Sequence, residues 1–378
     1  MIKNYDKDFY SIMKGYAIIC IALHNLLHLK ELTGFVMENE NSFDVQNTYD
    51  FFNAIKSLNV SIIGQIFSFL GWVGVPVFLF ISGLGLMKKY QNQVDLDVKK
   101  YVIYSWKKLF LLMLPAEIFL ILFTLCSGKL HLSLILKSLL KLSLLNNFII
   151  TIIEILPGIF WYFGLIFQLY VLFLIFRKMK NSQLIILMIV FLLLQLITVP
   201  GWLIKNNNVW RTLRYNFTGW GHIFILGMIV GKMNDIKFCP EKMSLKILLL
   251  IISFILLPVL NLSYVLWLFF LPFVALYVFI LLADIINYND NIFRKIGLFL
   301  GKYSAFIFVT HAVIRRVILS PFFNKYYMPI LQKYNIKILG QTFIYIFLFI
   351  IGALIYKQIY HFLMNINFLS FTSKKDVA

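Results

Sequence analysis

The chain has 378 residues, of which 61% are apolar and only 13% are charged, and its mean hydropathy is +0.85. A soluble protein has no use for so much apolar surface, so the composition excludes a soluble globular protein. The formal net charge of +19 comes from lysines and arginines in short loops between apolar blocks. Membrane topology and anionic lipid headgroups explain this charge better than nucleic acid does. We therefore expect contact with membrane lipid and no nucleic-acid partner.

The apolar residues come in blocks of about 18 to 25 residues, long enough for helices to cross a hydrocarbon core of about 30 Å. The first block follows the polar stretch MIKNYDKDFY and has no cleavage site behind it, so we expect it to stay as a spanning helix. The predicted fold is an all-α polytopic membrane protein with about ten transmembrane helices, in which residues 1–378 form one membrane domain. The expected spans lie near residues 11–29, 60–87, 102–126, 158–177, 183–204, 217–232, 245–263, 264–286, 297–319 and 340–363.

Residues 131–153 interrupt their apolar run with Lys137, Lys141, Asn146 and Asn147. A lysine at the centre of a bilayer costs about 2.5 to 3.5 kcal/mol. We expect this segment to be interfacial or partly embedded, with its lysine side chains extending toward the headgroups. With ten spans and cytoplasmic N- and C-termini, most of the 35 Lys and Arg residues fall on the cytoplasmic side, as the positive-inside rule requires.

Polar residues inside the predicted spans fall into two groups by depth. Ionisable groups in a membrane usually face a bundle interior or a wet cavity, because exposure to lipid costs too much. The two groups therefore predict a polar path with a basic inner mouth and imidazoles near the outside. The outer group is His24, His28, Glu117, Trp161, Tyr162, His222 and His311, and the inner group is Lys14, Ser82, Lys107 and Lys108.

Four stretches of sequence then occur in a recognisable order: KGYAIICIALHN at 14–25, GWVGVPVFLFISGLGL at 71–86, WYFGLIFQLY at 161–170 and GKYSAFIFVTH at 301–311. With them the chain resembles the integral-membrane acyltransferase family 3, which includes O-acetyltransferases of bacterial surface polysaccharides. The resemblance covers about residues 8–320. It implies a membrane enzyme that transfers an acyl group.

The chain departs from the family pattern at several positions. In the family, ten residues usually separate a basic residue in the first span from a histidine considered catalytic, whereas nine separate Lys14 from His24 here, and Asn25 holds the usual histidine register. One residue turns a side chain by about 100° on a helix, so either His24 faces the cavity by a local rotation or His28 shares its role. Lys14 replaces the commoner arginine, and Pro76 replaces the usual acidic residue after Gly-Val.

His24 is the residue in which the resemblance and the chemistry agree. Acyl transfer from a thioester to a sugar hydroxyl needs a base for the attacking oxygen, and imidazole titrates near neutral pH. An acyl-histidine intermediate is the alternative route. His28 lies four residues further on, on nearly the same helix face, where it could orient His24, bind the acceptor or serve only the structure.

The resemblance places the acyl donor at the basic inner mouth. Lys14, Lys107 and Lys108 would contact the phosphates of a cytosolic coenzyme A donor, although each lysine also fits a positive-inside anchor. The family pattern in the second span implies that its residues line a donor channel. Small residues at these positions could equally serve close helix packing. These residues are Phe78, Ser82 and Gly83.

The remaining candidates are expected to line the acceptor side or the cavity. Trp161 and Tyr162 also suit a membrane-interface belt. His311 lies in an otherwise apolar helix with Arg315 four residues on, and Glu117 could pair with one of the histidines.

The sequence therefore predicts an O-acyltransferase of the bacterial cytoplasmic (inner) membrane that moves an acyl group, most simply acetyl, from acyl-CoA to a surface glycan or a lipid-linked glycan. Acyl-CoA is a substrate, and neither a permanently bound cofactor nor a metal is expected; the three cysteines lack the spacing of a disulfide or metal site. The alternative is a transporter or glycan-export component without acyl-transfer chemistry. Acceptor identity, the hydroxyl position and oligomeric state stay open.

Overall fold

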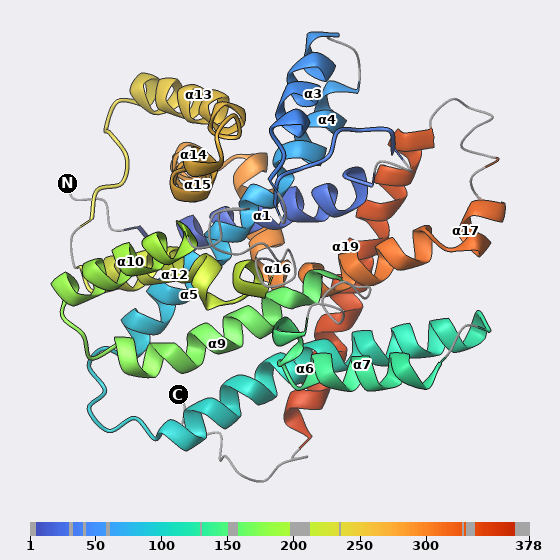
Figure 1. Cartoon of the computed structure of the whole chain (residues 1–378), viewed down its shortest axis with the longest axis horizontal. Helices are drawn as coiled ribbons and strands as arrows, with labels where there is room; N and C mark the ends of the chain where they lie inside the picture. Colours follow the sequence, from blue (N-terminus) through green and yellow to red (C-terminus); the bar gives the residue numbers. More distant parts are fainter. Residues whose placement is uncertain are drawn as a thin grey trace.

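A computed structural model describes residues 5–29, 33–40, 43–57, 61–128, 131–149, 158–196, 212–233, 236–326, 329 and 337–366. Within these residues all regular structure is helical, which confirms the all-α class (Figure 1). The longer helices are α1 (Lys7–Leu27), α3 (Val45–Lys56), α4 (Ile62–Leu70), α5 (Val75–Tyr90), α6 (Val98–Cys126), α7 (Leu132–Leu142), α9 (Trp161–Phe176), α10 (Asn181–Leu196), α12 (Phe217–Gly231), α13 (Met243–Leu260), α15 (Leu271–Ile286), α16 (Ile292–Ile318) and α19 (Lys337–Asn365). The short ones are α14 (Tyr264–Phe269), α17 (Pro321–Tyr326) and the 3-10 turns η1 (Gly71–Gly74), η2 (Asn146–Phe148) and η3 (Gly158–Phe160).

Seven helices in the described part of the chain are long and apolar enough to cross a membrane, so the protein is a multi-pass membrane protein. They correspond to seven of the expected spans, and α10 and α15 are shorter apolar helices at two more. Helix α12, at the remaining position, has 15 residues and is buried along most of its length. The end of the expected span 183–204 lies outside the described residues beyond Leu196. The count of ten and the sidedness of the termini stay predictions.

Two expected spans are broken helices. The span near 60–87 consists of α4, the 3-10 turn η1 and α5 in succession, where Gly71, Gly74 and Pro76 replace regular helix formers. The span near 264–286 divides into α14 and α15 at Phe270, two residues before Pro272. The first break matters for function because it lies against the C-terminal half of α1.

Helix α1 runs through the middle of the bundle and packs along α16, which in turn packs against α19 (Figure 1). Small residues allow the close approach of α1 and α16: a Cβ on Gly301 would lie 1.9 Å from the Ser11 carbonyl oxygen, and one on Gly15 would lie 2.2 Å from that of Gly297. Such contacts between helix backbones are typical of membrane bundles. The position of α1 is therefore fixed along its length, including the histidines at its C-terminal end.

Helix α7 packs against α6 and has only 11 residues, too few to span a membrane, which agrees with the expectation for this segment. The expectation that its lysines reach the headgroups is wrong for Lys141. The Lys141 ammonium group is buried with a side chain 2% exposed and lies 3.6 Å from the carboxylate of Glu117 on α6. A carboxylate within reach holds this lysine inside, because an unpaired charge there would be far costlier.

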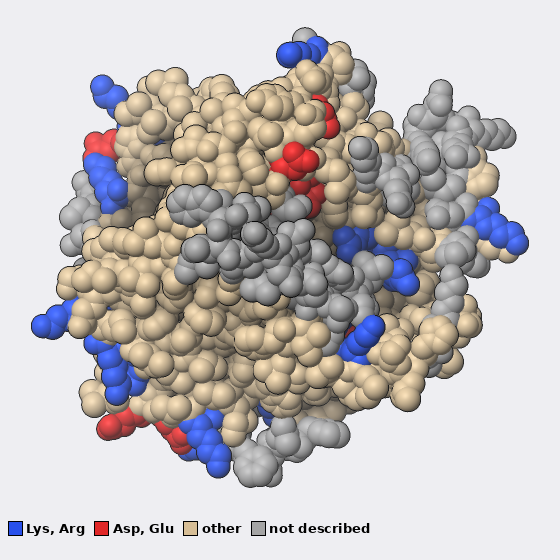
Figure 2. Space-filling view, in the orientation of Figure 1, with Lys and Arg blue, Asp and Glu red and all other residues tan. Residues whose placement is uncertain are grey.

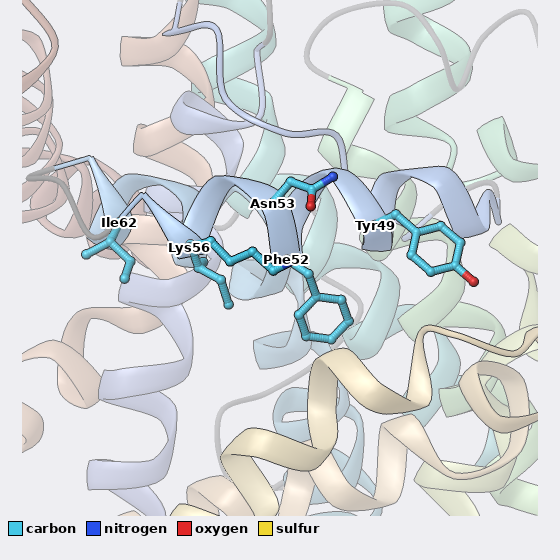
Figure 3. A pocket seen from close by; sticks show the side chains of 6 residues that line it. Tyr49, Phe52, Asn53, Lys56 and Ile62 are labelled. Carbon is cyan, nitrogen blue, oxygen red and sulfur yellow. The ribbon is translucent and has the colours of Figure 1, made fainter.

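The outer surface is largely apolar. Tan atoms cover most of the face in Figure 2, and the charged atoms form small scattered groups. On α13, Ile251 and Ile255 are 52% and 60% exposed, as expected of side chains that face lipid. Hollows in the described surface include one of about 520 Å³ between α3 and the start of α4 (Figure 3), an apolar one of about 410 Å³ among α1, α4, η1, α13 and α15, and one of about 550 Å³ among α1, α16 and α19. None of these three is lined by a candidate catalytic side chain.

Candidate active site

The ring of His24 is held at the point where α4 ends. The last four carbonyls of α4 include those of Phe67, which accepts from the Gly71 backbone N–H, and of Ser68. The His24 Nδ1 atom lies 2.9 Å from the Ser68 carbonyl oxygen and 3.3 Å from that of Phe67. Because carbonyl oxygens only accept hydrogen bonds, Nδ1 carries the hydrogen. The Nε2 atom therefore presents its lone pair, the form required of a general base.

The helix break at η1 brings this end of α4 close enough to α1. Gly71 begins η1, and a Cβ there would lie 2.6 Å from both the His24 Cβ and the Cys20 carbonyl oxygen. Any larger side chain would push α4 away from His24. The glycine thus sets the short distance between the imidazole and the carbonyls that orient it.

His28 lies directly beside His24. The two rings are stacked, with centroids 4.7 Å apart and an interplanar angle of 19°. Its Nδ1 atom donates to the His24 carbonyl oxygen at 2.7 Å. The structure thus brings both candidate histidines together, with His24 the more deeply buried of the two.

Asn25, in the register where the family usually has its histidine, holds an arginine instead. Arg315 Nη1 donates to the backbone oxygen of Asn25 at 2.9 Å and to its side-chain oxygen at 3.0 Å. Arg315 is 5% exposed, and its guanidinium acts electrostatically on both His24 and His28. One turn earlier on α16, His311 is fully buried and donates from Nδ1 to the Ile307 carbonyl oxygen at 2.9 Å. Arg315 is therefore part of the histidine site.

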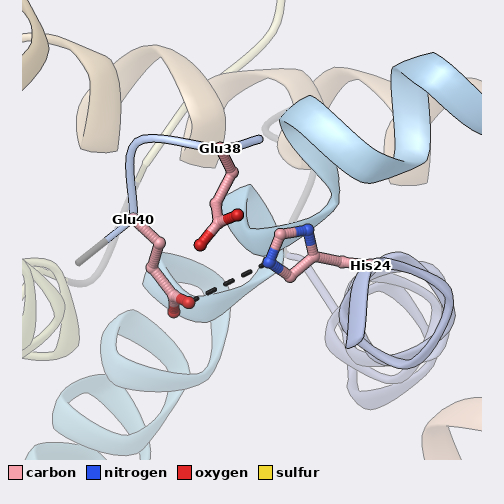
Figure 4. A group of neighbouring side chains, drawn as sticks. All are labelled: His24, Glu38 and Glu40. Atoms are coloured by element: carbon pink, nitrogen blue, oxygen red, sulfur yellow. Dashed lines mark ion pairs between the residues drawn. The ribbon is translucent and has the colours of Figure 1, made fainter. Parts of the chain in front are cut away.

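Two acidic residues that sequence reasoning missed complete this end of the bundle. Glu38 and Glu40, in the loop before α3, both point toward His24 (Figure 4). The Oε2 atom of Glu40 lies 4.0 Å from His24 Nε2, and one ligand atom from each of the three residues falls within a 4.8 Å cluster. Arg214, sandwiched between the rings of Trp220 and Trp267 at 4.2 and 4.7 Å, acts electrostatically on Glu40. In the sequence, the only signal was a Glu-Asn-Glu triplet in a loop.

The candidate donor residues gather about ten residues earlier along α1. Lys14 of α1 and Lys108 of α6 lie close enough to repel each other electrostatically, and Lys107, which precedes Lys108 in the chain, is half-buried. Two ammonium groups held together are a natural site for phosphate. Ten residue steps along the helix lead from Lys14 to His24, which corresponds to about 15 Å.

The candidate residues of the second span have different neighbours, and Gly83 serves helix packing. The Ser82 hydroxyl lies beside the phenol groups of Tyr162 and Tyr170, and Phe78, one turn earlier, is half-buried. Gly83 instead faces α12, where a Cβ would lie 2.1 Å from the Phe224 carbonyl oxygen. Helix packing is thus sufficient to explain Gly83.

The aromatic candidates of the third motif lie inside the bundle. Trp161 is 6% exposed and stacks on Trp220, with centroids 6.1 Å apart. The ring of Tyr162 meets that of Phe308 at 5.3 Å, and Phe308 in turn meets His311 at 5.7 Å. The interface-belt role expected for Trp161 is wrong, because its ring is enclosed by protein.

Glu117 lies apart from the histidine cluster. Its charged partner is Lys141, at 3.6 Å, so the expected pairing with a histidine is not found. This carboxylate joins α6 to α7 and has a sufficient structural role there.

Comparison with known proteins adds one finding to this geometry. No curated protein and no solved structure matches the chain. A family model described as an acyltransferase domain matches residues 8–358, which include every candidate side chain above. The match favours an enzyme over the transporter that the sequence left open. The chain belongs to the membrane-bound acyltransferase family 3, and the protein is an acyltransferase.

Proposed function

We propose that the protein is an O-acyltransferase that moves an acyl group, most simply acetyl, from acyl-CoA to a hydroxyl of a surface polysaccharide or a lipid-linked glycan in the bacterial inner membrane. The observation that carries the proposal is the orientation of His24. Its Nδ1 hydrogen is committed to the Ser68 carbonyl oxygen at 2.9 Å, so Nε2 is left as a base at a buried, charged site. A hydroxyl nucleophile needs such a base.

The reaction forms one C–O bond and breaks one C–S bond. The acceptor hydroxyl gives its proton to His24 Nε2 as its oxygen attacks the thioester carbonyl. The new C–O bond forms, the C–S bond breaks, and the leaving thiolate takes the proton back from the imidazolium. In this direct route His24 acts first as a base and then as an acid.

Arg315 is suited to the charge that develops on the thioester oxygen. It is a buried cation held beside His24 through two hydrogen bonds to Asn25, at 2.9 and 3.0 Å. Preorganised donors of this kind stabilise an oxyanion more strongly in a water-poor site than in water. The one-residue shift from the family pattern then has a purpose, because Asn25 positions the arginine and His24 supplies the base.

The donor fits the opposite end of α1. Lys14 and Lys108 would hold the phosphates of coenzyme A, and its flexible pantetheine arm would cover the distance of about 15 Å along the helix to His24. The small and aromatic side chains of Ser82 and Tyr162 would lie along this path. This arrangement lets a donor and an acceptor approach His24 from opposite ends of the bundle.

The test uses purified protein in detergent or lipid with radiolabelled acetyl-CoA. We expect label to pass to members of a panel of methyl glycosides of hexoses and N-acetylhexosamines, and free thiol to appear in equal amount. His24→Ala should abolish transfer, whereas His131→Ala, which removes an exposed imidazole, should not. Label that accumulates on the protein before transfer would replace the direct route by an acyl-histidine. Absence of transfer from acetyl-, succinyl- and longer acyl-CoA donors to every glycan would contradict the proposal.

A further inference from the structure

We propose that Glu38 and Glu40 are acceptor-binding residues: a carboxylate pair that holds neighbouring hydroxyls of a polyhydroxylic acceptor at His24 and stabilises the imidazolium during transfer. This inference rests on the proposed function and names residues that neither the motifs nor the family match assigns. It limits the acceptor to molecules with a second hydroxyl near the reacting one, as in a sugar ring.

The loop that carries the two glutamates is anchored at its start. Val36 donates its backbone N–H to the Gln65 side-chain oxygen at 3.0 Å, and the Ser68 hydroxyl donates to the Val36 carbonyl oxygen at 2.7 Å. The same Ser68 supplies the carbonyl that orients His24. The base and the loop are therefore held by one residue of α4.

Asn39, between the two glutamates, anchors the loop at its centre. Its side chain is fully buried and donates to the Asn261 side-chain oxygen at 3.2 Å, and its own oxygen accepts from the Asp44 backbone N–H at 3.1 Å and from Asn47 at 3.0 Å. The chain bends at Asn39 and Glu40. With Asn39 pointing into the protein, Glu38 and Glu40 both turn toward His24 (Figure 4).

The facing atoms leave a place for a hydroxyl. His24 Nε2 and the Glu40 carboxylate are both acceptors in this state, and their separation of 4.0 Å is too long for a direct hydrogen bond. This separation would let one hydroxyl oxygen lie at about 2.8 Å from each atom, an ordinary hydrogen-bond distance. One hydroxyl has only one hydrogen to give. If the reacting hydroxyl donates to Nε2, the Glu38 carboxylate still needs a donor of its own.

The Glu38 carboxylate is the group that needs this second donor. Its Oε2 atom is buried and has no hydrogen-bond partner among the described residues. A buried carboxylate oxygen without a donor is costly, and a ligand hydroxyl would satisfy it. Glu38 also lies within electrostatic reach of His28. The carboxylate pair thus accepts a hydrogen bond from a second hydroxyl of the acceptor. Glu40, nearest Nε2, offsets the positive charge that His24 gains in the transition state.

The test compares Glu38→Gln and Glu40→Gln with the wild type in steady-state transfer to the best glycoside of the panel. Glutamine keeps the size of the side chain and removes the charge. We expect Glu40→Gln to lower kcat about 10- to 100-fold and Glu38→Gln to raise KM for the acceptor about tenfold, with KM for acetyl-CoA unchanged in both. Glu40→Asp should recover part of the loss in kcat. Asp50→Asn, which removes an exposed carboxylate of α3, should behave as the wild type.

Two further measurements separate this role from structural and metal-binding roles. Because Glu38→Gln removes a charge whose buried Oε2 atom has no hydrogen-bond partner among the described residues, this variant should unfold at the wild-type temperature or above it, whereas a structural role predicts a lower one. Transfer should resist a chelator. Unchanged kinetics in both glutamine variants of an active enzyme, or activity lost to the chelator and restored by Zn²⁺ or Ca²⁺, would overturn the inference. An inactive wild type would instead count against the proposed function.

Discussion

Two regions of the molecule hold carboxylates largely away from solvent, and their partners differ in kind. Between α6 and α7, Glu117 faces the ammonium group of Lys141 at 3.6 Å, so a negative charge meets a positive one. Beside α1, Glu38 and Glu40 face an imidazole whose nearest nitrogen has no hydrogen. In the first arrangement a cation lies within reach of the carboxylate, although Glu117 Oε1 makes no hydrogen bond to a described residue. In the second, Glu38 Oε2 has no hydrogen-bond partner among the described residues, and an acceptor molecule would supply its donor.

The difference shows that burial of a carboxylate does not by itself distinguish a structural role from a catalytic one. A buried ion pair gains its Coulomb energy only by offsetting a large desolvation cost, and breaking it leaves an uncompensated charge. A buried group whose partner is missing costs stability, and enzymes tolerate that cost where a substrate will complete the site. We therefore expect substitutions at α6 and α7 to change stability, and substitutions around His24 to change the rate.

The largest effect should come from the base itself. We expect His24→Ala to lower single-turnover acetyl transfer about 10² to 10⁴-fold at matched expression, since that is the usual cost of losing a general base. His28→Ala should cost less and should act partly through KM for the acceptor. Donor binding, measured separately, should persist in both. If His28→Ala were inactive and His24→Ala active, the general base would be His28 instead of His24.

The ion pair of α6 and α7 gives the largest expected effect on stability. Lys141→Ala leaves the Glu117 carboxylate buried alone and should destabilise the folded state by about 3 to 5 kcal/mol, measured by thermal unfolding in detergent. Exchanging both residues for apolar ones, Lys141→Met with Glu117→Leu, should recover most of that loss. Transfer per folded molecule should stay at the wild-type level in both. A catalytic defect in the stable double variant would bring Glu117 back to the active site.

Asn39 offers a way to disturb the glutamates without touching them. Asn39→Ala removes the hydrogen bonds to Asn261, Asp44 and Asn47 and should loosen the loop. We expect kcat to fall and KM for the acceptor to rise, together about tenfold in kcat/KM, with KM for acetyl-CoA unchanged. Asn53→Ala, on the neighbouring helix α3, serves as the control. Equal losses in the two variants would remove the special role of the loop.

The smallest effect concerns the donor end. Lys14→Ala and Lys108→Ala should each raise KM for acetyl-CoA about tenfold, because each removes one charge from a phosphate site, while kcat at saturating donor changes little. Lys14→Arg should bind the donor at least as well. If the two alanine variants instead raised KM for the acceptor and left KM for acetyl-CoA unchanged, the acceptor would bind at the lysines and the donor at the other end of α1.

Much of the fold followed from hydropathy, since membrane spans need long apolar runs. The short α7 was also predictable, because its lysines interrupt the run. The breaks at Gly71–Gly74 and Phe270 were missed, although glycine and proline stand at the first and Pro272 follows the second. An apolar run shows that a segment can enter the membrane. It does not show whether its helix is continuous.

The site was predictable where a motif marks it, and less so where contacts decide it. The motif identified His24 and Lys14, while the close approach of Arg315 to Asn25 depends on how α16 packs on α1. Glu38 and Glu40 lie in a polar loop, where acidic residues are ordinary and no spacing distinguishes them. Only the fold, through Asn39, brings them to the imidazole.

The most direct test of the account asks whether His24 and Glu40 act as one unit. Single-turnover acetyl transfer to the acceptor glycoside would be measured for the wild type, His24→Ala, Glu40→Gln and the double variant. Groups that act on the same proton transfer lose their effects non-additively. We predict that Glu40→Gln, which slows the wild type about 10- to 100-fold, has no further effect once His24 is alanine. Rate losses that multiply in the double variant would contradict the account, because the carboxylate would then act independently of the base.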